Sequence, residues 1–219
     1  MKNFLYTLFF SLLVFPLASH ASGNLESTDL VGVTFWVISV ALVASTAFFF
    51  FESLRVKGKF RTSLVVSGLV TLVAAIHYFY MRDVWVSTGT SPTVFRYIDW
   101  VITVPLLMIE FYLILAACTK VSLGVFWRLT LGTLVMLIAG YLGEAGFIDS
   151  TIGFVVGMGG WAYILYEIFA GEAATVNASQ ATPAVQSAYN SMKWIVTIGW
   201  AIYPLGYFFG YLAGGADDA

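Results

Sequence analysis

The sequence predicts an all-α integral membrane protein, and three observations support this fold class. The 219-residue chain is 60% hydrophobic but only 10% charged, whereas about a quarter of the residues of a typical soluble domain are charged. Six long apolar runs follow one another, each close to the roughly twenty residues that a helix needs to cross the hydrocarbon core. The runs lack the strict alternation of a membrane β-strand. Since only helices and closed barrels satisfy their backbones in lipid, we expect six membrane-spanning helices.

The first 21 residues differ from the rest and predict a secretory signal peptide. The chain begins with the basic dipeptide MK, residues 4–17 are apolar, and the tripeptide SHA supplies the small residues of a cleavage site. An uncleaved anchor helix is the alternative. Cleavage before Ser22 would leave residues 22–219 as the transmembrane domain, with its N-terminus outside a bacterial inner membrane.

The apolar runs predict where the helices lie and which way they cross the bilayer. The expected helices cover residues 30–51, 62–81, 94–117, 123–142, 151–170 and 190–213. Short polar turns connect them, apart from the longer segment 172–189, which is rich in Ala, Ser, Thr and Asn. Basic residues crowd the first connection and flank the third, whereas the fourth carries Glu144 and Asp149. By the positive-inside rule, the first and third connections are cytoplasmic. We therefore expect a multi-pass protein whose third helix runs from outside to inside.

Composition and motifs argue against several function classes. The net charge of −2, without a basic patch, gives no reason to expect a nucleic-acid partner. The lone Cys118 cannot form an internal disulfide, and no Cys/His cluster has metal-ligand spacing. The sequence also lacks a catalytic triad, a phosphate loop and a dinucleotide fingerprint. We expect neither a metal site nor an enzyme, and without an internal repeat an inverted-repeat transporter is not supported.

The third expected helix carries charges that a membrane segment could avoid. Steps of three, four, four and three residues place five side chains on one helix face: Arg96, Asp99, Thr103, Leu107 and Glu110. Asp99 and Glu110 are about 16 Å apart along the axis at roughly 1.5 Å per residue. One carboxyl therefore lies in each half of the membrane. A charge at the bilayer centre costs at least ~2.5–3.5 kcal/mol, so it normally faces a pathway inside the protein.

The placement of the two carboxyls favours proton export. Asp99 near Arg96 is expected to be ionised and able to accept a proton, whereas Glu110 among apolar neighbours is expected to hold one that it can donate. Structural alternatives stay open. Arg96 could snorkel to the outer interface, Asp99 could serve only as its ion-pair partner, and Glu110 could be structural. His77 in the second helix could equally be a packing histidine.

Aromatic side chains on three helices favour a flat, apolar chromophore as the ligand. The stretch GWAIYPLGYFFGYL places Trp200, Tyr203 and Pro204 on one face, with a proline that kinks the helix. Trp100 and Trp161 add rings from the third and fifth helices. Ordinary packing or an interfacial aromatic belt is the alternative.

Several long motifs make the chain resemble the proteorhodopsin family, the bacterial retinal-binding branch of the microbial rhodopsins. SPTVFRYIDWVITVPLL, GYLGEAG, YEIFAGE, TPAVQSAYNSM and GWAIYP occur in the order and spacing of that family, and the resemblance extends from the signal peptide to residue 213. It implies a microbial-rhodopsin-like helix bundle, all-trans retinal as cofactor, and a light-driven outward proton pump of the green-absorbing type. A retinal-based photosensor and a non-pigmented truncated opsin or scaffold are the alternatives.

The resemblance also implies roles for matched residues. Asp99 would be the proton acceptor and counterion, Glu110 the cytoplasmic donor, and Arg96 the gate toward the outside. Thr103 would complete the proton-pump triplet with the two acids. His77 would hydrogen-bond the acceptor and tune its affinity for protons.

A second set of matched residues concerns the chromophore and the oligomer. The resemblance assigns Trp100, Trp200, Tyr203 and Pro204 to the retinal pocket, and Leu107 to the position where leucine accompanies green absorption. Trp36 is implied to meet His77 from a neighbouring protomer, so a homo-oligomer through this region is expected.

One departure from the family concerns the lysine that holds retinal. In the family this lysine lies on a seventh helix, whereas this sequence ends at GGADDA, in the expected outer loop before that helix. Six of the seven helices are therefore expected. The lysines lie outside the apolar cores of the spans: Lys2, Lys57, Lys59, Lys120 and Lys193. We expect the sequence to be a fragment, with a natural six-helix opsin as the alternative.

Overall fold

The computed structural model describes residues 25–213, and the expected signal peptide lies outside them. The described chain is helical, and six of its segments are long and apolar enough to cross a membrane. The first four spans are single helices: α2 (Leu30–Arg55), α3 (Phe60–Thr88), α4 (Thr93–Cys118) and α5 (Leu123–Glu144). The fifth contains α6 (Ser150–Phe169) and α7 (Glu172–Gln180). The prediction of an all-α, six-span membrane bundle is confirmed.

Four helices, α2, α5, α6 and α8, start at residues whose side chains cap them. The Asp29 carboxylate accepts a hydrogen bond from the Gly32 amide at 2.9 Å and so caps α2. Asp149 caps α6 by accepting from the amides of Thr151 and Ile152. At the other end of α3, Gly89 adopts a left-handed conformation with φ 67°, which ends the helix at little steric cost.

The end of α3 differs from the expectation because polar residues extend the helix. The expected second span stops at residue 81, but α3 continues to Thr88. Arg82 is buried there, pairs with Asp83 at 2.8 Å and lies over the ring of Trp36 at 5.1 Å. The guanidinium is thus satisfied within the outer membrane boundary, and the helix can continue beyond its apolar run.

The prediction of a non-helical connection over residues 172–189 is wrong, because most of this segment is helical. It contains α7 and the first part of α8 (Pro183–Trp194). Thr182 caps α8 through the Val185 amide, and Pro183 occupies the first turn, where its missing N–H costs nothing. The last span therefore begins at Pro183 rather than at residue 190.

The last span is irregular around the proline expected to kink it. After α8 come a π-helical turn, η1 (Ile195–Gly199), the short α9 (Ile202–Tyr207) and a second π-helical turn, η2 (Phe208–Leu212). Pro204 has no N–H to donate to the Trp200 carbonyl, which accepts instead from Tyr203 at 3.1 Å. The Trp200 amide reaches back five residues to Ile195 at 3.2 Å. Such turns re-aim the side chains that follow them.

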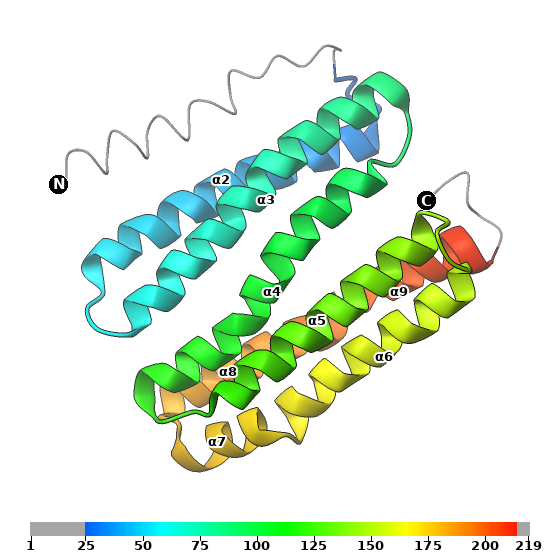
Figure 1. Ribbon diagram of the computed structural model, residues 1–219. Coiled ribbons are helices and arrows are strands. Elements are labelled where there is room, and N and C mark those ends of the chain that lie inside the picture. The colour runs from blue at the N-terminus through cyan, green and yellow to red at the C-terminus, as the bar shows by residue number, and fades with distance from the viewer. Residues whose placement is uncertain (1–24, 214–219) are drawn as a thin grey trace.

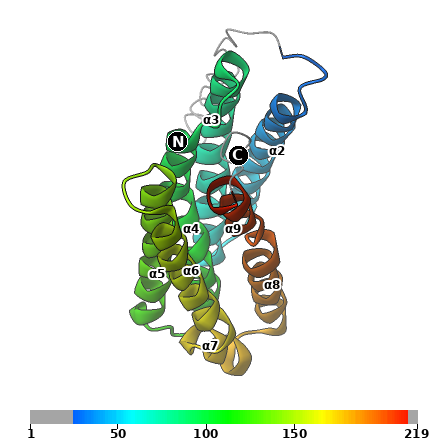
Figure 2. The same ribbon diagram turned by 90° about the vertical axis from the view of Figure 1, so that its right-hand side faces the viewer.

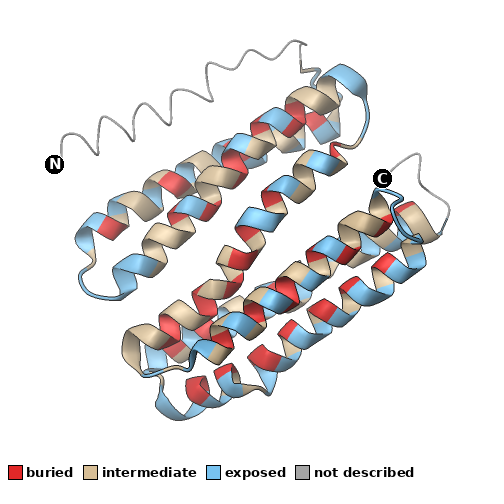
Figure 3. Ribbon diagram, viewed as in Figure 1, coloured by how far each residue is buried: buried red, intermediate tan, exposed pale blue. Residues whose placement is uncertain are grey.

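The arrangement of the helices places α4 at the centre. Figures 1 and 2 show α2 and α3 as one packed pair, α5 and α6 as another, and α4 crossing between them; α9 contacts α6, and α8 contacts α4. Buried positions form stripes on the helix faces that meet (Figure 3). Glycines let α5 and α6 approach closely, since a Cβ at Gly160 would lie 2.7 Å from the Met136 amide nitrogen. The outward faces expose large apolar side chains, as a lipid-facing surface does.

Candidate functional site

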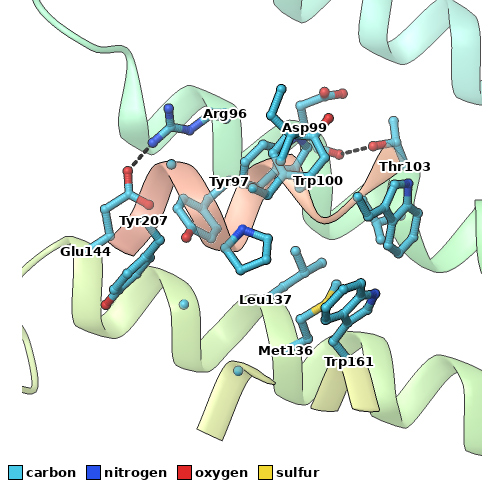
Figure 4. Close-up of a pocket in the computed structure, with 18 of the residues that line it drawn as sticks. Arg96, Tyr97, Asp99, Trp100, Thr103, Met136, Leu137, Glu144, Trp161 and Tyr207 are labelled. Atoms are coloured by element: carbon cyan, nitrogen blue, oxygen red, sulfur yellow. Dashed lines mark hydrogen bonds and ion pairs between the residues drawn. The ribbon is translucent and has the colours of Figure 1, made fainter. Parts of the chain in front are cut away.

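A cavity of about 510 Å³ lies inside the bundle, and its wall is largely apolar. Side chains from α2 to α6 and from the last span line it (Figure 4). The lining includes nine of the eleven residues proposed from sequence for the site: Arg96, Asp99, Trp100, Thr103, Leu107, Trp161, Trp200, Tyr203 and Pro204. The other two, His77 and Glu110, lie outside the lining. The cavity lining thus contains the residues that the spacing on α4 predicted on one face, except for Glu110.

Asp99 is the buried acid of the cavity. It is 2% exposed, and its Oδ1 has no hydrogen-bond partner among the described residues. On the same helix, the Thr103 hydroxyl donates to the Asp99 carbonyl at 2.9 Å, which leaves the carboxylate free (Figure 4). A buried oxygen without a partner is costly. Its position in the cavity wall therefore suits a ligand that brings a hydrogen-bond donor or a positive charge.

His77 on α3 lies beside Asp99 without a hydrogen bond to it. Its Nδ1 is 3.6 Å from Asp99 Oδ1, but the same nitrogen is 2.9 Å from the Val73 carbonyl oxygen. Because a carbonyl can only accept, Nδ1 carries a proton and donates it to Val73. The hydrogen bond to the acceptor that the resemblance implies is therefore not made in this structure.

Arg96 does not pair with Asp99 as expected from their spacing. Its guanidinium forms an ion pair with Glu144 (Figure 4) and lies 5.4 Å from the centre of the Trp100 ring. The reason is geometric: Arg96 lies one turn outside Asp99, and its long side chain reaches the last residue of α5 at the same membrane end. Asp99 is left without a cationic partner from its own helix.

Glu144 is a site residue that the sequence did not single out. Its side chain is only 4% exposed and accepts hydrogen bonds from Thr93 at 3.1 Å and from Tyr211 at 2.8 Å, in addition to Arg96. The sequence analysis placed Glu144 in the fourth connection, within GYLGEAG, as a loop charge. The available signal was its position at the end of an apolar run, where a charge needs a partner.

Glu110 lies between α4 and α3, away from the cavity. It is 5% exposed, and hydroxyls of Ser63 and Ser67 donate to its two carboxylate oxygens, the latter at 2.9 Å. The two serines were also missed. Their signal was a four-residue spacing of hydroxyls within the apolar run TSLVVSGLV, which places both on one face of α3.

Aromatic rings form the walls of the cavity. The rings of Trp100 and Tyr203 meet edge to face with centroids 4.9 Å apart. The Trp161 indole donates to the Val196 carbonyl at 3.3 Å, in the first π-helical turn. These contacts fix two walls of a flat slot whose polar side is Asp99.

Retinal fits the wall chemistry of this cavity, but its attachment is not seen. An elongated apolar ligand with a cationic nitrogen would match the aromatic walls and the unpartnered Asp99 oxygen. The lysines of the described segment do not line the cavity, and three of them lie on or beside the first and third connections: Lys57, Lys59 and Lys120. The described residues therefore offer a binding slot without an amine for a covalent bond.

Trp36 lies on α2, separate from the cavity lining. It is 40% exposed and meets the buried Phe79 edge to face at 5.9 Å. The Arg82 guanidinium also lies 5.1 Å from the centre of the Trp36 ring, whereas His77 is directed toward Asp99.

The fold and the site together define a multi-pass helical membrane protein with an aromatic ligand cavity next to a buried carboxyl. Residues 29–217 match the family of bacteriorhodopsin-like proteins, and the chain belongs to that family. It is 54% identical over 209 residues to a green-light absorbing proteorhodopsin from Gamma-proteobacterium EBAC31A08, a match that covers 95% of this chain and 84% of the relative.

Two further comparisons agree. A blue-light absorbing proteorhodopsin from Gamma-proteobacterium Hot 75m4 is 53% identical, with coverage of 94% of this chain and 81% of the relative. The crystal structure of a blue light-absorbing proteorhodopsin from Med12 superposes with a TM-score of 0.72 at 53% identity, covering 84% of this chain and 82% of the other. The resemblance to proteorhodopsins drawn from the sequence motifs is confirmed.

Proposed function

We propose that this protein is a light-driven outward proton pump that uses all-trans retinal as its chromophore. The observation that carries the proposal is the pair of buried carboxyls on α4. Asp99 faces the aromatic cavity with an unpartnered oxygen, and Glu110 lies eleven residues further toward the cytoplasmic end. Relatives named proteorhodopsins at 53–54% identity support it. The protein is accordingly a transporter rather than an enzyme.

The proton path follows from the order of the groups along α4. Bound retinal would supply light absorption and a proton held on a cationic nitrogen. Asp99 Oδ1, which is buried without a partner in the cavity wall, would accept this proton, and Thr103 holds the turn that positions it by donating to the Asp99 main-chain carbonyl. One turn before Asp99 on α4, Arg96 pairs with Glu144, and both side chains line the cavity at the end away from Glu110. Glu110, on the cytoplasmic side, is placed to return a proton after the first transfer.

The walls of the cavity select and orient the chromophore. Trp100 and Tyr203 form one edge-to-face pair, while Trp161 and Trp200 extend the apolar surface toward the cytoplasmic side. Pro204 interrupts the last span at the cavity. A flat, dry slot of this kind keeps the proton on its intended route, because bulk water would offer competing acceptors.

Membrane placement and assembly belong to the same proposal. The basic residues of the α2–α3 and α4–α5 connections support a bacterial inner-membrane location with that end of the bundle on the cytoplasmic side and the N-terminus outside. The exposed Trp36, which packs on Phe79 of α3, supports a homo-oligomer through the Trp36 and His77 region. Lipid is the third expected partner, since the outward faces are apolar.

The test is light-driven acidification of the medium by cells that express the full-length gene product with retinal, in weak buffer. We expect Asp99→Asn to abolish the pH change. Glu110→Gln should slow turnover while leaving the first proton transfer intact. Asp149→Asn makes the same chemical change at the exposed N-cap of α6, outside the cavity lining, where asparagine also caps a helix; it serves as the matched control and should acidify normally. Undiminished acidification by Asp99→Asn would remove Asp99 from the acceptor role.

A further inference from the structure

The two oxygens of Glu110 are held by two different hydroxyls. The Ser63 hydroxyl donates to Oε2 and the Ser67 hydroxyl donates to Oε1, the latter at 2.9 Å. Both serines belong to α3, and their four-residue spacing puts them on one face, about 6 Å apart along the axis at roughly 1.5 Å per residue. The carboxyl therefore has two chemically distinct sides, one for each serine.

The two sides face different ends of the protein. Ser63 is in the first turn of α3, which begins at Phe60 directly after the basic α2–α3 connection. Ser67 is one turn deeper. Above them, the Lys59 ammonium lies 3.3 Å from the Ala116 carbonyl oxygen and so bridges the ends of α3 and α4 on the cytoplasmic side. Ser63 and Ser67 are both half-buried, whereas Glu110 is buried. Ser63 is the serine nearer to the α2–α3 connection, because α3 begins only three residues before it.

A serine hydroxyl is suited to this place because it can donate and accept at once. It stabilises the carboxylate by donating, and it rotates to accept when the carboxyl carries a proton. A proton that arrives from the cytoplasm meets Oε2 and Ser63 first. A proton that leaves toward the cavity departs from the side of Oε1 and Ser67.

We propose that Ser63 is the positioning residue for proton uptake, holding Glu110 Oε2 toward the cytoplasm so that the carboxyl is reprotonated from that side. This inference rests on the proposed function and deepens it, because it separates the refilling of the donor from its discharge. Ser67 holds the other oxygen, Oε1, and affects the step in which Glu110 gives its proton to the cavity. The two serines therefore affect different steps, which a purely structural role for both would not produce.

The test uses the full-length gene product with retinal in membranes, and it compares single hydroxyl deletions at the cytoplasmic end. Ser63→Ala and Ser67→Ala remove the two contacts. Ser53→Ala is the matched control, since Ser53 is buried in the last turn of α2 and donates only to the Phe50 carbonyl of its own helix at 2.8 Å. Ser63→Thr restores a hydroxyl at the site.

Two measurements are made on each variant. The infrared carbonyl band of Glu110, assigned by its loss in Glu110→Gln, reports the hydrogen bonds of the carboxyl in the dark. A pH dye in the cytoplasmic compartment reports the rate of uptake after a flash. Ser63→Ala should shift the band and slow uptake about tenfold, the scale at which a hydrogen bond to a charged group acts, with discharge of Glu110 changed less than about twofold. Ser63→Thr should recover both.

The outcomes separate this proposal from the proposed function. Uptake in Ser63→Ala as fast as in Ser53→Ala, in a protein that otherwise pumps, would overturn the role of Ser63 alone. Equal slowing of uptake and discharge by both serine deletions would also overturn it, since that is the behaviour of a structural contact. Absence of any light-driven proton movement in the unsubstituted protein would overturn the proposed function and the uptake role with it.

Discussion

The ion pair at the outer end of the cavity leads to a quantitative stability prediction. Glu144→Ala removes a side chain that is 4% exposed and that accepts from Arg96, Thr93 and Tyr211. Removing one partner of a buried ion pair costs about 3–5 kcal/mol because the remaining charge is left uncompensated. Arg96 is 28% exposed and lies over Trp100. We therefore expect the lower end of that range, a loss of about 3 kcal/mol in the free energy of unfolding.

A conservative substitution refines the same prediction. Glu144→Gln keeps an oxygen that accepts from Thr93 and Tyr211, and it loses only the charge, so we expect a smaller loss of about 1–2 kcal/mol. Unfolding in a denaturing detergent, followed by tryptophan fluorescence, measures both losses. Arg96→Gln, alone and combined with Glu144→Gln, completes a double-mutant cycle with an expected coupling of about 1 kcal/mol or more. Two results would show that the Arg96–Glu144 pair does not stabilise the protein. One is a free energy of unfolding for Glu144→Ala equal to that of the wild type, and the other is additive losses from the two single variants in the cycle.

Three further predictions address packing, colour and attachment. Gly160→Ala should destabilise the protein by about 1–3 kcal/mol, because the new Cβ would lie 2.7 Å from the Met136 amide nitrogen. Gly159→Ala is the control, since its Cβ would meet nothing within 4 Å. Equal thermal unfolding midpoints for the two variants would contradict this packing. Leu107→Gln should move the visible absorption toward blue, since residue 107 lines the cavity, and an unmoved spectrum would detach this position from colour. A polypeptide of residues 1–219 should yield no borohydride-trapped retinal adduct, because the lysines of the described segment lie outside the cavity lining, and a trapped adduct would show that reasoning to be wrong.

Much of the fold follows from the sequence because membrane helices are set by length and hydropathy. The expected starts of the first five spans agree with the structure within two residues. Segment 172–189 was misread because α7 has little apolar character of its own. Its helix depends on tertiary contacts: Ala173 and Val176 are buried, and the Ala173 amide donates to Glu167 at 3.0 Å. A nine-residue helix is marginal without such contacts, and composition cannot reveal them.

In the site, too, features set by local helical spacing could be predicted, whereas contacts between helices could not. The positions on α4 could be predicted, because helical periodicity alone puts Asp99 and Thr103 on one face. The partner of Arg96 could not, since Asp99 is near in sequence while Glu144 is 48 residues away and becomes a neighbour only when α4 packs on α5. The contact between Ser63 and Glu110 likewise depends on how α3 and α4 pack.

Asp99 is proposed to accept the proton that light releases in the cavity, and infrared difference spectroscopy observes this transfer at the carboxyl itself. On illumination of the full-length gene product with retinal, a carbonyl band of a newly protonated carboxylic acid should appear. The band should be absent in Asp99→Asn and should still appear in Glu110→Gln, where only its decay is slowed. A protonated-carboxyl band that forms undiminished in Asp99→Asn would contradict the account, because another group would then be the acceptor.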